Sequence, residues 1–324
     1  MSKKYQDIDQ KIQILKQRNL LFTDEEDAKY RINEFGYYEI ISDNSDPFMI
    51  DEKYIEGTRF FDIYALFCFG GEIRDHIQKS SIFFEKLLRQ AVLKAWCEEY
   101  GNHQSKYLDK KNFRFPRKGP QPLNNLVSKF AKVSFADDDP ILNKARVENN
   151  NVAPWILVKF LDFGNIISWY ELLKPELKTK VMKHLLDDKT FNNLNSKSGK
   201  DLFTHMLKLI KKFRNRSAHG GQVYTYMPTL PSGKPFIKYN QYFHSKFGIT
   251  KEKYDEGYGQ TGIWTILALL KLIKHPEPYL ILSHLLNGGF KEYLQKVDTM
   301  RHYINTKTFY IDTEIQNEQT HLNI

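Results

Sequence analysis

The chain of 324 residues contains little of what dominates small stapled or fibrous proteins. Two cysteines, Cys68 and Cys97, are too few for a disulfide framework or a cysteine-rich zinc module. Only 17 glycines and 12 prolines exclude a collagen-like or linker-dominated chain. No run of about 18 apolar residues is present, so we expect no membrane span. The polar first ten residues lack the apolar centre of a signal peptide, which predicts a cytoplasmic protein.

Apolar residues and positive charge are well represented. Hydrophobic residues make up 41% of the chain and aromatic residues 14%, enough for a large ordered core. The formal net charge is +9 at pH 7, which favours a polyanionic partner such as nucleic acid. A lysine-rich solvated surface is the alternative interpretation of the same charge.

Apolar residues recur mostly at helical spacing, which predicts an all-α fold in one domain. A long helix is expected over residues 72–100, separated from the helix before it by Gly70-Gly71. Another begins at Ser198 or Asp201 and ends near His219. Residues 36–41 and 221–226 have weak strand character. We expect an irregular accessory insertion at about 227–262 and a frayed tail at 306–324.

The strongest local motif is Arg-Asn-x-x-x-His at the end of the last of these helices. Arg214, Asn215 and His219 form it, and Gly220-Gly221 follows at once. Spacing alone does not separate a catalytic pair from an ordinary basic helix end, where cations suit the helix dipole.

Together with other segments, this motif resembles the Abi (abortive infection, Abi_2-like) family of the HEPN ribonuclease superfamily. The similarity covers about residues 8–224. Its other pieces, in order, are Leu15, Leu20-Leu21-Phe22, Asp24, Ala28, Phe35-Gly36-Tyr37-Tyr38, Phe61-Asp62-Ile63-Tyr64-Ala65-Leu66, Ile73-Arg74, Phe84-Glu85-Lys86-Leu87-Leu88-Arg89, Pro154-Trp155-Ile156 and Phe163-Gly164-Asn165. Gly70-Gly71 departs from the pattern near a position where an Asp is expected.

The resemblance implies a HEPN-like helical bundle and an endoribonuclease that acts in phage defence or toxin-like growth arrest. RNA carries its own nucleophile, the 2′-OH, so cleavage requires proton transfer and stabilisation of an anionic phosphorane, without an obligatory metal or cofactor. His219 suits proton transfer, and Arg214 offers permanent donors to phosphate oxygens. Asn215 would orient the loop or hydrogen-bond the site. A non-catalytic RNA-binding or protein-interaction module on the same fold is the alternative.

Helical geometry limits how one chain can use the pair. Residues five apart on an ideal helix differ by about 140° in direction. Either the helix bends before His219, or a second subunit completes the site. The resemblance implies a homodimer, because HEPN-like nucleases place two such motifs together. It also allows a noncoding RNA or a protein antitoxin as partner.

Supporting residues are expected on the long helix. Glu85 and Arg89 are four residues apart, which by itself predicts a surface ion pair of small energy. The resemblance instead places them beside the site, with Glu85 orienting Arg214 and Arg89 helping to bind RNA.

Two basic segments are candidate RNA-binding surfaces. Residues 102–122 interleave basic and aromatic side chains, which suits backbone neutralisation and base stacking, although a solvated loop packed by its two Phe residues would look alike. The helix of the motif adds further lysines. The predicted RNA-binding residues are Lys110, Lys111, Arg114, Arg117, Lys208, Lys211 and Lys212.

Overall fold

The computed structural model describes residues 6–117, 119–136, 138–289, 308–311 and 313. The all-α prediction is confirmed over these residues. The α-helices are α1 (Ile8–Gln17), α2 (Glu25–Phe35), α3 (Phe60–Tyr100), α4 (Gln104–Leu108), α5 (Gln121–Ser134), α6 (Pro140–Asn149), α7 (Pro154–Leu157), α8 (Phe163–Leu172), α9 (Pro175–Leu185), α10 (Asp188–Leu194), α11 (Lys197–Ala218), α12 (Gln241–Lys246), α13 (Lys251–Glu256), α14 (Ile263–Leu270) and α15 (Glu277–Ser283). Short 3-10 or π turns cover η1 (Tyr38–Ser42), η2 (Asp46–Phe48), η3 (Lys110–Asn112), η4 (Val158–Phe160) and η5 (His284–Gly289).

The described strands form a single two-stranded antiparallel hairpin, β1 (Met49–Ile50) with β2 (Lys53–Tyr54). The strand predicted at 36–41 is wrong, because Tyr38–Ser42 forms a π turn that follows directly after α2. The strand predicted at 221–226 is also absent. That segment is a loop whose Tyr224 hydroxyl donates to Asn44 Oδ1 at 3.1 Å, so its aromatic side chains serve packing rather than pairing.

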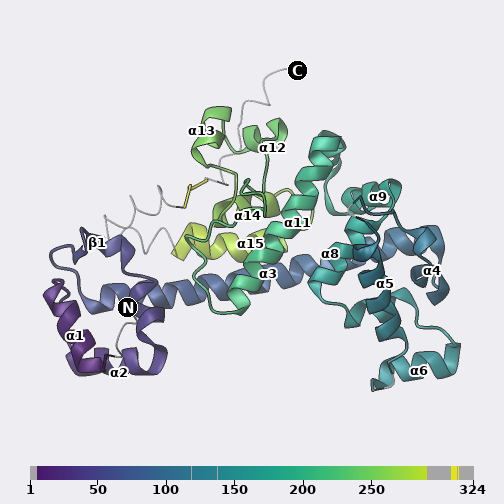
Figure 1. Cartoon of the computed structure of the whole chain (residues 1–324). Coiled ribbons are helices and arrows are strands. Elements are labelled where there is room, and N and C mark those ends of the chain that lie inside the picture. Colours follow the sequence, from purple (N-terminus) through teal and green to yellow (C-terminus); the bar gives the residue numbers. More distant parts are fainter. Residues whose placement is uncertain (1–5, 118, 137, 290–307, 312, 314–324) are drawn as a thin grey trace.

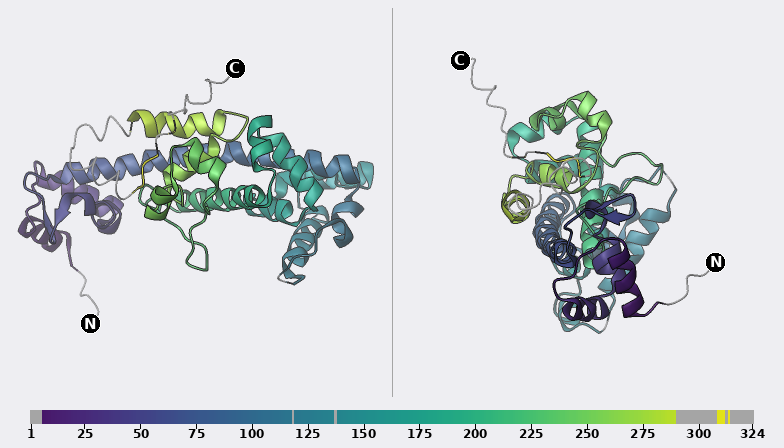
Figure 2. Two further views of the ribbon diagram at one scale, coloured as in Figure 1. Left: turned by 90° about the horizontal axis from the view of Figure 1, so that it is seen from above. Right: turned by 90° about the vertical axis from the view of Figure 1, so that its left-hand side faces the viewer.

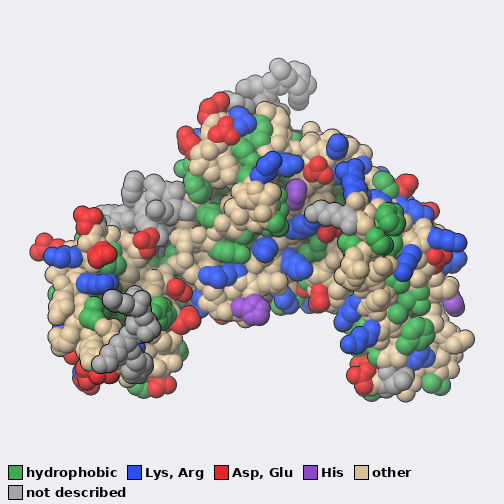
Figure 3. Space-filling model, viewed as in Figure 1, with side chains coloured by type: hydrophobic (Ala, Val, Ile, Leu, Met, Phe, Trp, Pro, Cys, Tyr) green, Lys and Arg blue, Asp and Glu red, His purple; other side chains and the backbone are tan. Residues whose placement is uncertain are grey.

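Helix α3 runs along the length of an elongated molecule, and the other helices pack along it (Figures 1 and 2). Its 41 residues span about 60 Å at 1.5 Å per residue. The α1–α2 end and the α4–α6 end extend to the same side of α3, which gives the arch seen in Figure 3. One stripe of α3 is buried along its whole length, from Ile63 to Trp96. Successive groups of helices therefore pack on one continuous element rather than around one round core.

The predicted break at Gly70-Gly71 is wrong, because α3 runs through both glycines. Each glycine costs up to about 1 kcal/mol relative to alanine in a helix. Burial of Leu66 and Ile73 on either side outweighs that cost. Gly70 is itself buried, with the ring of Tyr224 packed close to it.

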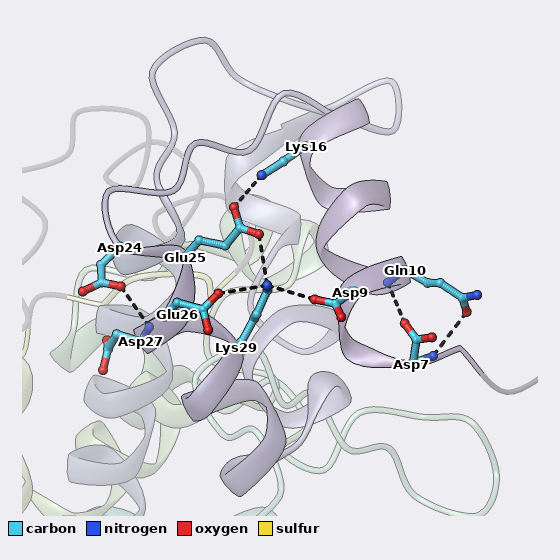
Figure 4. A network of polar contacts seen from close by, with 9 residues as sticks. All are labelled: Asp7, Asp9, Gln10, Lys16, Asp24, Glu25, Glu26, Asp27 and Lys29. Carbon is cyan, nitrogen blue, oxygen red and sulfur yellow. Dashed lines mark hydrogen bonds and ion pairs between the residues drawn. The ribbon is translucent and has the colours of Figure 1, made fainter.

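A polar network holds the first two helices together at one end of the arch (Figure 4). Lys29 Nζ lies 2.9 Å from Asp9, 3.0 Å from Glu26 and 3.4 Å from Glu25. Lys16 reaches the same Glu25 at 2.5 Å. The carboxylate of Asp9, followed by that of Glu26, raises the pKa of Lys29 above its usual range. The pairs are solvent-exposed, so they fix the angle between the helices more than they stabilise the fold.

The segment 227–262 is more ordered than predicted. It contains α12 and α13, and its buried side chains include Phe236, Ile237, Phe243 and His244. Tyr239 stacks on the His244 ring at a centroid distance of 4.9 Å, and Tyr254 contacts it edge-to-face at 5.0 Å. The predicted frayed tail lies outside the described residues except for 308–311 and 313. Of these, Thr308 accepts a hydrogen bond from the Trp264 indole at 2.9 Å.

Candidate active site and basic groove

Helix α11 carries the candidate site and crosses the middle of α3 (Figure 1). It begins where the Ser196 hydroxyl caps the backbone N–H of Gly199 at 3.1 Å. Its apolar face is buried against α3, α8 and α14. The buried side chains on that face include Leu202, Phe203, Met206, Leu209, Ile210 and Phe213. These contacts fix the rotation of α11 and thereby the direction of its polar residues.

The predicted helix end is confirmed. The helical residues stop at Ala218, His219 is the C-terminal cap, and Gly220 adopts φ +74°, which terminates the helix. The His219 side chain is exposed and Arg214 is half-buried. Arg214 Nη1 donates to Asn215 Oδ1 at 3.3 Å. Asn215 is thus the neighbour that positions the guanidinium.

Arg216, which lies between the motif residues, has a different environment. Its Nε donates to the Gln222 carbonyl at 3.1 Å, and its guanidinium lies over the Tyr226 ring at 5.3 Å. A Cβ at Gly221 would come within 2.2 Å of Arg216 Nε, so a larger residue there would displace the Arg216 side chain from this position. Arg216 therefore fastens the loop after α11.

Arg214 and His219 are not joined directly. Helix α11 is continuous through Ala218, and residues five apart on an ideal helix differ by about 140° in direction, so we expect the two side chains to diverge around the axis. No hydrogen bond joins them in the described part of the chain. Both alternatives given by the sequence, a bend before His219 and completion by a second subunit, stay predictions.

The ion pair between Glu85 and Arg89 forms, but it is not a surface pair. Glu85 is 9% exposed, and Arg89 Nη2 donates both to Glu85 and to the Leu161 carbonyl, the latter at 2.6 Å. The pair therefore links α3 to the segment that precedes α8. Among the described residues, Glu85 and Arg214 share no hydrogen bond or ion pair, so the orienting role stays a prediction.

The α11 lysines line a furrow of about 830 Å³ that reaches the motif. Lys208, Lys211 and Lys212 lie on it with Asn215, and a turn of the accessory segment closes the other wall. That turn contributes Leu230, Pro231, Ser232 and Phe236. Gly164 makes room for one lysine, since a Cβ there would come within 2.5 Å of Lys211 Nζ.

The residues predicted in the 102–122 segment divide into two groups. Lys110 and Lys111 are exposed on η3. Arg114 and Arg117 instead line a cleft of about 840 Å³ that also includes Lys208 of α11. Phe113 anchors the segment by packing on Trp96, with ring centroids 4.9 Å apart, whereas Phe115 is exposed. The segment is therefore neither a free loop nor one continuous basic strip.

Sequence reasoning missed Lys178, which lines the same cleft from α9. It stands in a helix that carries several other lysines, so no local signal distinguished it. Only the packing of α8, α9 and α11 brings it beside Arg114 and Lys208.

Positively and negatively charged side chains are unevenly distributed over the face seen in Figure 3. Lys and Arg lie mainly over the centre and one limb of the arch, and Asp and Glu gather at the other end. Within the described residues, no group of three or more His, Cys, Asp or Glu is close enough to hold a metal ion. None of the described helices combines the length and apolarity that a bilayer span requires.

Comparison with protein-family models establishes the family of the chain. The model described as "Abi-like protein" matches residues 30–225. The chain belongs to this Abi-like family. No curated protein and no solved structure matches the chain.

The family match agrees with the resemblance found in the sequence. The Abi-like region includes the Glu85–Arg89 pair and the whole Arg214–His219 motif, and it ends just before the accessory segment at 227–262. Membership implies the context of abortive infection, a form of defence against phage. The wall that the accessory segment adds to the furrow lies outside the family match.

Proposed function

We propose that this Abi-like protein is a metal-independent endoribonuclease of the HEPN type that acts in phage defence or toxin-like growth arrest. The observation that carries the proposal is the position of the motif. An exposed His219 caps α11 five residues after Arg214, and a furrow lined by three lysines leads to Asn215. A polyanion lying in that furrow would bring its backbone to the end of α11.

The residues divide the reaction by their chemistry. Arg214 donates to a non-bridging phosphate oxygen and stabilises the charge of the phosphorane. His219 transfers protons between the 2′-OH nucleophile and the 5′-oxygen leaving group. Asn215 holds the Arg214 guanidinium through the 3.3 Å hydrogen bond. The phosphodiester bond breaks as the 2′ oxygen attacks, which yields a 2′,3′-cyclic phosphate and a 5′-hydroxyl.

A homodimer supplies both groups to one phosphate. Because Arg214 and His219 diverge around α11, Arg214 of one protomer and a His219 from its partner would face the same cleft. The two-fold symmetry of such a dimer creates two equivalent pairs at one interface.

The chemistry is tested with RNA substrates in excess chelator. We expect the purified chain to cut RNA under these conditions and to leave 2′,3′-cyclic phosphate ends. A strand with 2′-deoxy sugars at the cut sites should resist, although it still binds. Binding of both strands without cleavage of either would favour the alternative, a non-catalytic RNA-binding module on the same fold.

A further inference from the structure

The cleft between α8, α9 and α11 has a surplus of positive charge at its floor. Lys178 is half-buried there, and its ammonium lies over the Tyr170 ring at 5.4 Å. No carboxylate of the described residues lies within ion-pair distance of Lys178 Nζ. The nearby Glu171 is already paired with Lys208 at 2.5 Å. Lys178 therefore keeps three N–H donors that no acid satisfies.

A second cation beside Lys178 also has a free donor. The Arg114 backbone is fixed by its N–H bond to the Leu172 carbonyl at 2.8 Å. Its Nη2 donates to the Glu171 carbonyl at 3.3 Å, while its buried Nε has no hydrogen-bond partner. A buried donor without a partner is costly, so the pair suits an acceptor that enters from the cleft.

The composition of the walls identifies the class of acceptor. Six cations line the cleft, namely Arg114, Arg117, Lys178, Lys197, Lys200 and Lys208, against the two carboxylates of Glu171 and Asp201. Burial, followed by the charge of Arg114, lowers the pKa of Lys178 to about 8. The excess of cations over carboxylates describes a site short of negative charge. The volume of about 840 Å³ accommodates a nucleotide-sized group.

The cleft and the furrow of the candidate active site share one lining residue on α11. Lys208 lines both, and Thr204 in the cleft and Asn215 in the furrow are separated by about 16 Å of helix at 1.5 Å per residue. A strand that occupies both therefore lies along α11.

We propose that the cleft around Lys178 and Arg114 is a phosphate-binding subsite that holds the backbone of single-stranded RNA at a distance from Arg214 and His219. The choice of RNA as the phosphate carrier rests on the proposed function. The phosphate chemistry itself rests on the cations of the cleft.

The test compares two Lys→Met changes on the same helix. Lys178→Met removes the charge and keeps an apolar side chain over Tyr170. Lys180→Met is the matched control, because Lys180 is exposed, pairs with Glu99 at 3.3 Å and lies outside the cleft. Binding is measured with a 2′-O-methyl RNA of about 20 nucleotides, which resists cleavage, at several salt concentrations.

Lys178→Met should weaken RNA binding about fivefold and reduce the slope of log affinity against log salt by about 0.7, the value for one lost contact to a single strand. Lys180→Met should change neither. Wild-type affinity and slope in Lys178→Met would overturn the proposal. So would a nucleoside triphosphate whose binding depends on Lys178 while RNA binding does not, since the cleft would then hold a free nucleotide.

The readout separates this proposal from the nuclease. If RNA affinity depends on Lys178 but the protein never cuts RNA, the subsite is supported and the proposed nuclease activity is contradicted. If the protein cuts RNA and Lys178→Met binds RNA like the wild type, the nuclease activity is supported and the subsite is contradicted.

Discussion

At the residue scale, the two arginines that flank Asn215 in the sequence, Arg214 and Arg216, have different environments. Arg214 donates to Asn215, whereas Arg216 donates to the Gln222 carbonyl and lies over the Tyr226 ring. Both are basic residues of the same motif in the sequence. Their hydrogen-bond partners therefore distinguish Arg214, the proposed phosphate-binding residue, from Arg216, which holds the loop after α11.

Arg216→Ala should therefore lower stability rather than activity. We expect the free energy of unfolding to fall by about 1 kcal/mol, because one hydrogen bond and one cation–π contact are lost. Urea unfolding measures this, and the RNA cleavage rate should stay far closer to wild type than that of Arg214→Ala. Unchanged stability together with a collapse of cleavage would show that Arg216 belongs to the reacting groups.

His244 is a second residue whose environment predicts a measurable effect. It is fully buried, its Nδ1 accepts from the Asn240 N–H at 3.0 Å, and its Nε2 donates to the Gly259 carbonyl at 3.3 Å. Burial lowers the pKa of His244 below 6.5, although its hydrogen bonds to the backbone of Asn240 and Gly259 oppose this. The folded chain therefore keeps a neutral imidazole where the unfolded chain takes up a proton.

Stability should consequently decline as the pH falls below about 6.5, through the lowered pKa of the folded state. The melting temperature between pH 7.5 and 5 measures the decline, and His244→Gln should show a shallower one. Equal slopes for wild type and His244→Gln would contradict the assignment.

At the element scale, the continuity of α3 through Gly70-Gly71 has a direct consequence. A Cβ at Gly70 would lie 3.7 Å from Arg74 and 3.9 Å from Tyr224, and one at Gly71 would lie 3.6 Å from Arg74. These are ordinary contacts, so alanine fits. Each Gly→Ala change should raise the free energy of unfolding by about 1 kcal/mol.

A third helical glycine provides the control for this measurement. A Cβ at Gly199 would come within 2.1 Å of the Leu194 carbonyl, so Gly199→Ala should destabilise the chain clearly. Chemical denaturation of the three variants tests the contrast. Destabilisation by both Gly70→Ala and Gly71→Ala would indicate that α3 is interrupted there.

The same two helices show what the sequence could predict. The end of α11 at His219 and its amphipathic face follow from local signals, namely apolar spacing, three basic residues and two glycines. The path of α3 through two glycines depends on burial by Tyr224, which lies about 150 residues away. The proximity of Lys178 and Arg114 could not be predicted from the sequence either, because it arises only when α8, α9 and α11 pack together.

At the scale of the whole molecule, we predict that a dimer is the active unit, because Arg214 and His219 are five residues apart on one helix. The specific cleavage activity per chain should fall on dilution as dimers dissociate. Sedimentation velocity at the assay concentration, run beside the activity measurement, tests this. Full activity from a strictly monomeric species would refute a site shared between protomers.

The central claim is that the end of α11 cleaves RNA, and His219→Ala tests it most directly. His219 is exposed and caps the helix through its backbone, so its removal should leave the fold and RNA binding intact. The account predicts that cleavage of one defined RNA in excess chelator falls by at least about 100-fold, as expected for a lost general acid or base. A folded His219→Ala chain that cuts the same RNA at the wild-type rate would contradict it.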